Sequence, residues 1–367
     1  MSTKETHIFA ESLEPEALRQ FEEAMEQPFA VKGCLLPDAH TGYSLPIGAV
    51  VATDNMVLPS WVGFDIGCGV AAVPTSFDAA EVVANADRIF QSIYRAVPVG
   101  FNHNQKESSW PEYVDLLRTD VLYQIFKRNG LRQLGSLGGG NHFIEIGKDE
   151  ANVIWVIVHS GSRGIGHSTA THYMKLASGS DKAKEGHFGF AADSPDGQAY
   201  ITDMDFCLAF ALENRRQLLV RVVWELSYYC KGTAFYSEMI NRNHNHAEQK
   251  DGLWIHRKGA THAEAGMMGV IPGNMRDGSF IVEGLGNPDS LYSSSHGAGR
   301  VMGRGVAKRT LSLQDFSDAM AGVTAKVDAE TLDESPAAYK DIFDVMRQQS
   351  AMVTVKRHIR PLINIKG

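Results

Sequence analysis

Cysteine is scarce in this sequence of 367 residues. The four cysteines form no Cys-x-x-Cys pair and no closely spaced set; they are Cys34, Cys68, Cys207 and Cys230. A scaffold held together by several disulfides is therefore excluded. Because no signal peptide is recognisable at the start of the sequence either, we expect a reducing, cytoplasmic setting for this protein.

Three other features are missing. No apolar run reaches membrane-spanning length, so the sequence predicts no membrane partner. No fixed-period repeat or low-complexity linker divides the chain, which favours a single large domain over residues 1–367. An excess of positive charge is also lacking. The net charge of -8 argues against a general nucleic-acid coat protein, but it permits a nucleic-acid enzyme with a locally basic cleft.

The composition is that of a globular protein with mixed secondary structure. Hydrophobic residues make up 44% and charged residues 21%, which is enough to build a large core. Apolar periodicity predicts helices over residues 13–25, 79–95, 111–129, 203–229 and 336–349. Strands are predicted at 154–158 and 279–283, and a loop followed by a further strand is predicted within residues 36–50. Residues 178–200 are polar and contain glycine, which predicts a long surface loop.

Residues 61–70, Trp-Val-Gly-Phe-Asp-Ile-Gly-Cys-Gly-Val, combine a carboxylate with a thiol three positions later. Glycines on both sides of Cys68 predict a tight turn in which the backbone can approach a bound group closely. Asp65 and Cys68 are thus two anionic candidates for metal ligands, and a thiolate can bridge two cations. The structural alternative is a buried free cysteine beside a turn aspartate.

Other ligand-type side chains also lie beside glycines or at the ends of strands. His142 follows a run of glycines, His159 ends an apolar strand, and His244 lies within Asn-His-Asn-His. Together with the carboxylate and thiol above, they would suffice for two divalent ions sharing the thiolate, an arrangement suited to phosphoryl transfer. A lone histidine at such a position is more often structural, and His159 could cap a turn. No spacing along the sequence proves that these residues meet in space.

Three further positions have two interpretations each. His296, among small residues and with Arg300 four positions later, could attack a phosphate through a neutral imidazole or could be a turn histidine bonded to backbone. Asp38 and His40 could belong to a site or to a hydrogen-bonded turn. The basic run over 304–309 could bind phosphate or form a solvated helix face.

These motifs together resemble the RtcB-type RNA ligases. The matching pieces run in family order over nearly the whole chain, at residues 37–40, 62–69, 137–145, 159–164, 244–245, 257–260, 272–273, 295–300, 336–340 and 366–367. So many ordered pieces make the match specific. The resemblance implies an α+β fold of the RtcB type, with central β-sheets flanked by helices.

The resemblance also implies an activity. Members join RNA ends that carry a 3′-phosphate or a 2′,3′-cyclic phosphate to 5′-hydroxyl ends, using GTP and two Mn²⁺ ions. The implied metal ligands are Asp65, Cys68 and His142 for one ion, and Cys68, His159 and His244 for the other. His296 is the implied nucleophile that carries GMP. The residues implied to line the guanylate site are Asn141, His142, Phe143, Ile144, Glu145, His244, Asn245, Pro272, Gly273, Asn274, Met275, Ser279, His296, Gly297, Ala298, Gly299 and Lys366.

The sequence departs from the family pattern at Asn274, Ser294 and His262, where many members have serine, cysteine and arginine. The changes at Asn274 and His262 bear on RNA positioning. Manganese is implied by the resemblance alone, because cysteine and histidine ligands suit zinc better. Two alternative functions stay open: a metal-dependent phosphoesterase or nucleotidyltransferase that seals no RNA, and an inactive RNA-end-binding protein. The sequence also leaves open whether the role is RNA repair or tRNA splicing, and whether an activating partner is needed.

Overall fold

A computed structural model describes residues 4–367 of the protein. Helices make up 35% and strands 27% of the structure. Of the pairs between named strands in this range, only two are parallel: β1 (Glu5–Ile8) with β2 (Ala30–His40), and β16 (Thr324–Ala325) with β17 (Val353–Lys366). Antiparallel sheets flanked by helices define an α+β fold, so the predicted fold class is confirmed.

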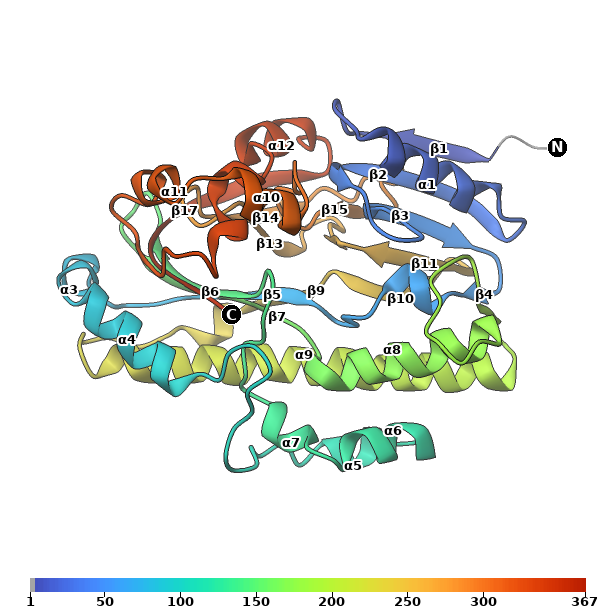
Figure 1. Ribbon diagram of the computed structural model, residues 1–367, viewed down its shortest axis with the longest axis horizontal. Helices are drawn as coiled ribbons and strands as arrows, with labels where there is room; N and C mark the ends of the chain where they lie inside the picture. Colours follow the sequence, from blue (N-terminus) through green and yellow to red (C-terminus); the bar gives the residue numbers. More distant parts are fainter. Residues whose placement is uncertain (1–3) are drawn as a thin grey trace.

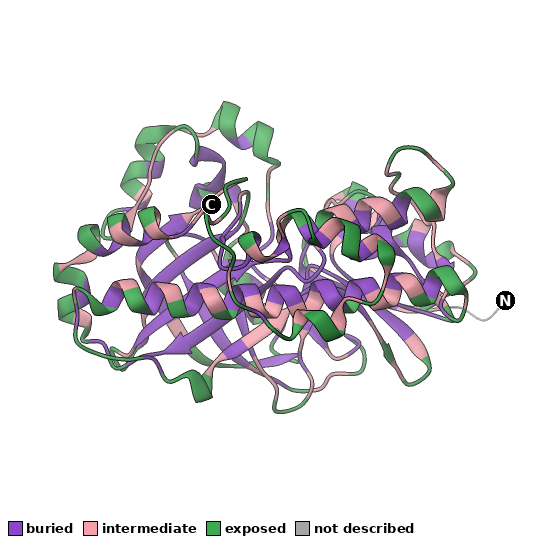
Figure 2. Cartoon of the chain, turned by 90° about the horizontal axis from the view of Figure 1, so that it is seen from below, coloured by how far each residue is buried: buried purple, intermediate pink, exposed green. Residues whose placement is uncertain are grey.

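The larger sheet has eight strands and carries most of the core. Its order is β13 (Met268–Pro272), β14 (Ser279–Gly284), β17, β6 (Phe143–Lys148), β7 (Ile154–Ser160), β5 (Gly69–Pro74) and β9 (Ile240–Asn243), with β16 beside β17. Every residue of β5 and β7 is buried, because the long helix α9 (Pro195–Ser227) covers one face of the sheet. In Figure 1, α9 runs beneath the strands along the length of the molecule. Figure 2 shows buried and exposed residues alternating along α9, with buried strands behind it.

A second sheet of five strands follows the order β1, β2, β3 (Ile47–Thr53), β11 (Leu253–Lys258) and β10 (Asn245–Lys250). Helix α1 (Pro15–Glu26) packs on it through Phe21, Ala24 and Met25. Two short ribbons complete the strands: β4 (Met56–Val57) with β8 (Phe190–Ala191), and β12 (Ala260–His262) with β15 (Ser293–Ser295).

The remaining helices are short, apart from α4 and α8. They are α2 (Pro59–Val62), α3 (Ala79–Ala84), α4 (Ala86–Ala96), α5 (Tyr113–Leu116), α6 (Asp120–Phe126), α7 (Gly130–Gln133), α8 (Arg163–Ser178), α10 (Arg304–Thr310), α11 (Leu313–Ala319) and α12 (Ile342–Gln348). No helix in residues 4–367 is both long enough and apolar enough to cross a membrane.

Three predicted helices are interrupted. The helix predicted over 79–95 splits at Asn85, whose φ of -111° leaves the helical region between α3 and α4. The helix predicted over 111–129 becomes α5 and α6, because the Thr119 hydroxyl accepts a hydrogen bond from the Leu122 N–H and starts a new helix. Within 336–349, a 3₁₀ turn precedes α12, whose first turn Asp341 caps. Capping side chains inside an apolar pattern therefore ended helices that periodicity alone would continue.

Two predicted loops are wrong in part. Residues 36–40 belong to strand β2, where the pairing register shifts between Leu35 and His40 and so accommodates Pro37. The loop predicted over 178–200 contains β8 and the first turn of α9. That helix begins early because the Ser194 hydroxyl caps it and Pro195 occupies its first position.

Candidate metal centre and active site

One edge of the larger sheet gathers the ligand-type residues. Four adjacent strands in the order β6, β7, β5, β9 carry them: His142 precedes β6, His159 is the penultimate residue of β7, Cys68 precedes β5, and His244 follows β9. Neighbouring strands here are antiparallel, so the starts of β6 and β5 lie level with the ends of β7 and β9. The ends of these four strands therefore bring four candidate ligands to the same side of the sheet.

The turn before β5 holds the carboxylate and the thiol. The Cys68 N–H donates to the Asp65 carbonyl at 3.1 Å, which closes the turn. Gly67 has a φ of +74°, and a Cβ there would lie 2.9 Å from the Ala211 side chain on α9. Only glycine suits both constraints, since the left-handed backbone and the close helix each disfavour a side chain.

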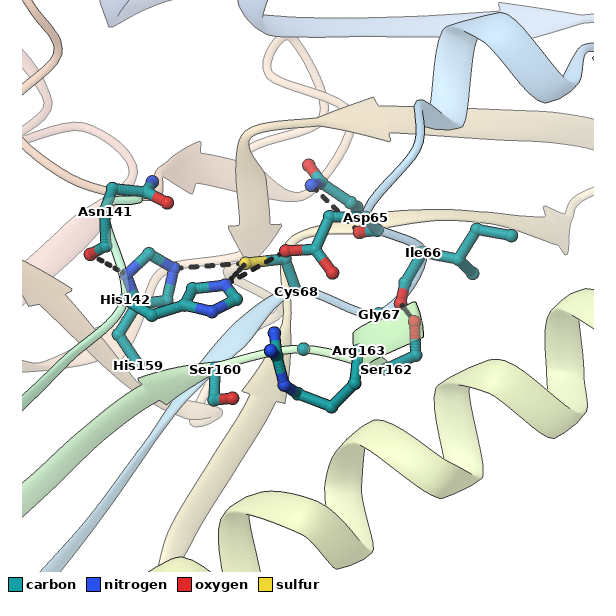
Figure 3. Close-up of polar contacts among 12 residues, drawn as sticks. Asp65, Ile66, Gly67, Cys68, Asn141, His142, His159, Ser160, Ser162 and Arg163 are labelled. Atoms are coloured by element: carbon teal, nitrogen blue, oxygen red, sulfur yellow. Dashed lines mark hydrogen bonds and ion pairs between the residues drawn. The ribbon is translucent and has the colours of Figure 1, made fainter. Parts of the chain in front are cut away.

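Two imidazoles point at the Cys68 sulfur (Figure 3). The Sγ atom lies 3.3 Å from His142 Nε2 and 3.2 Å from His159 Nε2. The Nδ1 atoms of these histidines donate to the carbonyls of Leu137 and Asn141, at 3.0 and 3.1 Å. With the proton fixed on Nδ1, each Nε2 presents its lone pair toward the sulfur. This is the outer-shell arrangement typical of metal-binding histidines.

His244 completes the cluster from the far side. Its Nε2 lies 3.4 Å from His159 Nε2, so two nitrogen atoms face one another. His142 Nε2 also lies 3.0 Å from Asp65 Oδ2. Ligand atoms fall into two sets, each within 4.8 Å: Asp65, Cys68 and His142, and Cys68, His159 and His244. Facing lone pairs repel unless a cation or proton lies between them, so this donor set fits two metal ions sharing the thiol.

Burial sets the protonation of the cluster. It lowers the pKa of His159 and of His244 well below the ordinary value, and neighbouring histidines add to the effect. Both imidazoles are therefore neutral and able to ligate. Burial also raises the pKa of the Cys68 thiol, and Asp65 raises it further. A bound cation would reverse this last effect, because coordination deprotonates a thiol.

His296 lies next to this cluster. Its ring centre is 4.8 Å from that of His244. Its Nδ1 is 2.6 Å from Asp38 Oδ2, and its backbone N–H donates to the same oxygen at 3.1 Å. Asp38 is fully buried, and its other oxygen, Oδ1, has no hydrogen-bond partner among the described residues. A buried carboxylate that accepts a hydrogen bond from Nδ1–H leaves Nε2 as the free, nucleophilic nitrogen.

A cavity of about 240 Å³ opens beside His296. Nine of the residues implied for the guanylate site line it: Asn141, Phe143, Pro272, Gly273, His296, Gly297, Ala298, Gly299 and Lys366. Arg300, Arg304 and Tyr339 line it as well. Of the remaining implied residues, His142 and His244 lie in the metal cluster, while Ile144 and Met275 pack into apolar clusters.

A group of unpaired polar atoms adjoins this cavity. Phe143 and Glu145 share one face of β6, because side chains alternate along a strand. Glu145 pairs across the sheet with Asn364, and Ser279 begins the nearby strand β14. Glu145 Oε1, Ser279 Oγ and Asn364 Oδ1 are buried without a well-formed hydrogen bond in the described structure, although the Ser279 and Asn364 side chains lie near enough to Glu145 to oppose the rise of its pKa. Burial raises the pKa of Glu145 to about 8, so the group can donate as a carboxylic acid. Unmet polar atoms of this kind suit the polar edge of a bound base.

A larger cavity, of about 670 Å³, lies on the other side of Asp65 and His142. Two arginines, Arg128 and Arg163, line it together with His103, His142 and His167. Asp65 is the single carboxylate among its lining residues. Gly138 is needed for this geometry, because a Cβ there would lie 2.0 Å from the Arg163 guanidinium. The cavity therefore has the charge expected of a phosphate-binding surface.

Comparisons with known proteins identify the family of this chain. The family described as "tRNA-splicing ligase RtcB" matches residues 20–124 and 113–367. The chain belongs to the RtcB family. "RNA-splicing ligase RtcB1" of Escherichia coli strain ATCC 25922 is 37% identical over 97% of this chain and 95% of the relative. "RNA-splicing ligase RtcB" of E. coli K12 is 36% identical over the same shares. "tRNA-splicing ligase RtcB" of Nanoarchaeum equitans is 30% identical over 91% and 87%.

Some residues of the site in this RtcB chain have an ambiguous sequence pattern, and others have none. Asp38 was as compatible with a turn as with a site, and its contact with His296 spans 258 positions. His40 bonds through Nδ1 to the Asp38 carbonyl at 2.9 Å, yet it also lines the smaller cavity. Glu334 carried no sequence signal. It lies 2.7 Å from Lys366 Nζ and 2.6 Å from Arg304, the first residue of the basic run.

The departures from the RtcB pattern lie in structural roles. Asn274 shapes the turn between β13 and β14, where its Oδ1 accepts from the Asp277 N–H at 2.9 Å. His262 belongs to a third group of ligand-type side chains, with His246 and Glu248. There the Arg257 guanidinium lies 2.5 Å from Glu248 Oε1 and 3.3 Å from His246 Nε2. The Arg257 guanidinium thus supplies a positive charge to this group, so we interpret the group as an ion-pair network. Ser294 pairs with Thr261 in the β12–β15 ribbon.

Lys366 provides a first test of the smaller cavity. The residue ends β17, and its Nζ lies 5.1 Å from the centre of the Phe143 ring. We expect Lys366→Met to weaken GTP binding about 10- to 100-fold, the loss of one charged hydrogen bond, measured by calorimetry. The free energy of unfolding should change little, because Glu334 retains its ion pair with Arg304. Lys356→Met, at an exposed position of the same strand, is the control and should bind GTP normally. Equal affinity of both variants would refute a role for Lys366.

Proposed function

We propose that this chain is an RNA ligase that joins 3′-phosphate or 2′,3′-cyclic phosphate ends to 5′-hydroxyl ends, with GTP and Mn²⁺. The observation that carries the proposal is the position of His296, paired to buried Asp38, beside a thiol–histidine cluster and a cavity lined by Arg300, Arg304 and Lys366. The family relationship supports the same reading, because its curated members are named as RNA-splicing or tRNA-splicing ligases.

Asp65, Cys68 and His142 would hold one ion, and Cys68, His159 and His244 the other. When bound, two such ions hold phosphate oxygens in line and neutralise developing charge. The choice of Mn²⁺ comes from the family resemblance, since soft and imidazole ligands alone favour zinc. The chain itself contributes three imidazoles and the Cys68 thiol, whose ligand atoms lie close together in the two sets.

His296 would act as the nucleophile. Asp38 accepts a hydrogen bond from Nδ1–H and so keeps the proton on Nδ1, which leaves the Nε2 lone pair free to attack the α-phosphorus of GTP; the N–P bond forms as pyrophosphate leaves. The RNA 3′-phosphate then takes GMP from Nε2 and becomes an activated end. The 5′-hydroxyl oxygen attacks that end, loses its proton and displaces GMP. A cyclic phosphate must first be opened by water.

The two cavities would divide the substrates between them. The cavity beside His296 would take the guanylate, with the protonated Glu145 and Lys366 toward the base and Gly297 to Gly299 close to the phosphate. The larger cavity, with Arg128 and Arg163, would take RNA phosphates. Local positive charge in a chain of net charge -8 is what a nucleic-acid enzyme needs to bind RNA without being a general coat protein.

Asp38 tests the role of the imidazole orientation. An asparagine at this position can donate to Nδ1 and would hold the other tautomer, with the proton on Nε2. We expect Asp38→Asn to slow formation of the GMP adduct by on the order of 10³-fold or more, as for other carboxylates that orient a catalytic imidazole. Metal content should stay normal. Single-turnover labelling with GTP measures the rate, and a wild-type rate would contradict the role of Asp38.

Ligation itself is tested with two labelled RNA strands. One strand carries a 3′-phosphate with a ³²P label and the other a 5′-hydroxyl. A ligase incorporates the labelled phosphate into the junction, where phosphatase cannot release it, and does so only when GTP is present. A phosphoesterase would release the label as inorganic phosphate, and an inactive RNA-end-binding protein would retard the strands without changing them. Either result would overturn the proposal.

A further inference from the structure

Helix α9 contributes one charged residue to the region behind the metal cluster. Arg215 is fully buried. Its guanidinium donates four hydrogen bonds, to the carbonyls of Gly67 and Ser160 at 2.8 and 2.9 Å and to the side-chain oxygens of Asn241 and Asn243 at 2.7 and 2.6 Å. These acceptors come from three segments that are far apart in the sequence.

Three of the four acceptors belong to residues next to candidate ligands: Gly67 precedes Cys68, Ser160 follows His159, and Asn243 precedes His244. A single planar group therefore holds the backbone beside Cys68 and His159 and the Asn243 side chain beside His244, so it contacts a neighbour of each ligand in one candidate set. A guanidinium suits this task because its donors form a rigid fork, whereas a lysine has one rotating nitrogen.

The charge of Arg215 has no ordinary partner. All four of its hydrogen bonds run to neutral oxygen atoms, although an unpaired buried charge is costly. Burial lowers the pKa of Arg215 to about 10, and Cys68 and Asp65 are the groups that oppose this decrease. Retaining such a residue is hard to explain by packing, because an apolar side chain would fill the same space at lower cost.

Asn214, the preceding residue, extends the same support. Its Oδ1 accepts from the Gly135 N–H at 2.7 Å, and its Nδ2 donates to the Ser160 hydroxyl at 3.0 Å and the Gly161 carbonyl at 3.1 Å. The pair thus links the glycine run that leads to β6 with the end of β7. Both residues lie in the helix that apolar periodicity predicts over residues 203–229.

We infer that Arg215 is a positioning residue of the metal centre, which holds the segments of Cys68, His159 and His244 in register before the ions bind. The inference rests on the metal centre in the proposed function and extends it to a residue that touches neither metal nor substrate. Removing a group that orients metal ligands typically weakens metal affinity 10- to 100-fold.

The test compares Arg215→Met with Arg221→Met. Arg221 is a half-buried arginine on the same helix that donates three hydrogen bonds through NH1, to Ala96, Asn104 and Gly135, and adjoins no candidate ligand. Each protein is stripped of metal and titrated with Co²⁺, whose visible bands and thiolate charge-transfer band report coordination. We expect the wild type to bind two ions, and at least one of them to bind Arg215→Met 10- to 100-fold more weakly with altered visible bands.

Arg221→Met should lose melting temperature but keep wild-type Co²⁺ affinity and spectrum. Wild-type affinity in Arg215→Met, or an equal loss in Arg221→Met, would overturn the inference while leaving the proposed function intact. A wild-type protein that binds no Co²⁺ would contradict the metal centre itself. If Arg215→Met does not fold, Asn243→Ala removes one of the four bonds at a half-buried position and should weaken Co²⁺ binding in the same direction. Unchanged binding in that variant would likewise overturn the inference.

Discussion

Replacement of Cys68 by alanine is expected to remove both metal ions and all transfer of GMP. The thiol belongs to both ligand sets, and its sulfur lies 3.3 and 3.2 Å from the imidazoles of His142 and His159. Without it, each set keeps two ligands, and one set loses its sole anion. We expect metal content measured by elemental analysis to fall from two ions per chain to nearly none, and GMP labelling to fall by at least 10³-fold.

Cys230→Ala is the matched control for this loss. Cys230 is also a buried free cysteine, but it packs in the core beside α9 and belongs to no ligand set in the described residues. Its truncation should lower stability modestly and leave metal content unchanged. Full metal content in Cys68→Ala would rule out the shared-thiol arrangement.

Replacement of His296 by alanine is expected to separate the two halves of the reaction. The side chain is 14% exposed and contacts Asp38 and His244, so its loss should leave the fold and the metals in place. Covalent GMP labelling should disappear. RNA that already carries a 3′-guanylylated end should still be sealed, because that step needs orientation and charge stabilisation without the nucleophile.

His358→Ala provides the control for His296→Ala. His358 is also a partly buried histidine, held by a 2.7 Å hydrogen bond to the Asp277 carbonyl and stacked on Phe280. The His358→Ala variant should form the covalent GMP adduct to the same extent as the wild type. Labelling of His296→Ala at the wild-type level would mean that another residue is the nucleophile. If the wild-type protein hydrolyses RNA ends without sealing them, the result would favour a phosphoesterase.

The ligand candidates were visible in the sequence because each has a local signature. Cys68 lies between glycines, His142 follows a glycine run, and His159 ends an apolar strand. Their convergence was not visible, because it depends on the strand order β6, β7, β5, β9, which brings together segments separated by up to 176 positions, the interval from Cys68 to His244. Sheet order is set by long-range packing, which no local pattern encodes.

Residues that act through others were harder to recognise. Arg215 lies in an apolar helical pattern, where a charged residue reads as part of the solvated face, yet it is fully buried. Asp38 reads as turn chemistry because it follows a proline, and the structure instead puts it in strand β2. Helix boundaries failed for a related reason: Asn85 and Thr119 stop or restart helices through caps that compete with apolar periodicity.

Formation of a covalent guanylate on His296 is tested by one labelling experiment. Purified protein is incubated with α-³²P-labelled GTP and Mn²⁺, denatured and separated by electrophoresis. We predict a labelled band that is stable to denaturation and labile to acid, as a phosphoramidate is, that maps to the peptide containing His296, and that transfers its label to RNA with a 3′-phosphate. Absence of any label on active, metal-loaded protein, or label on a peptide without His296, would contradict the account.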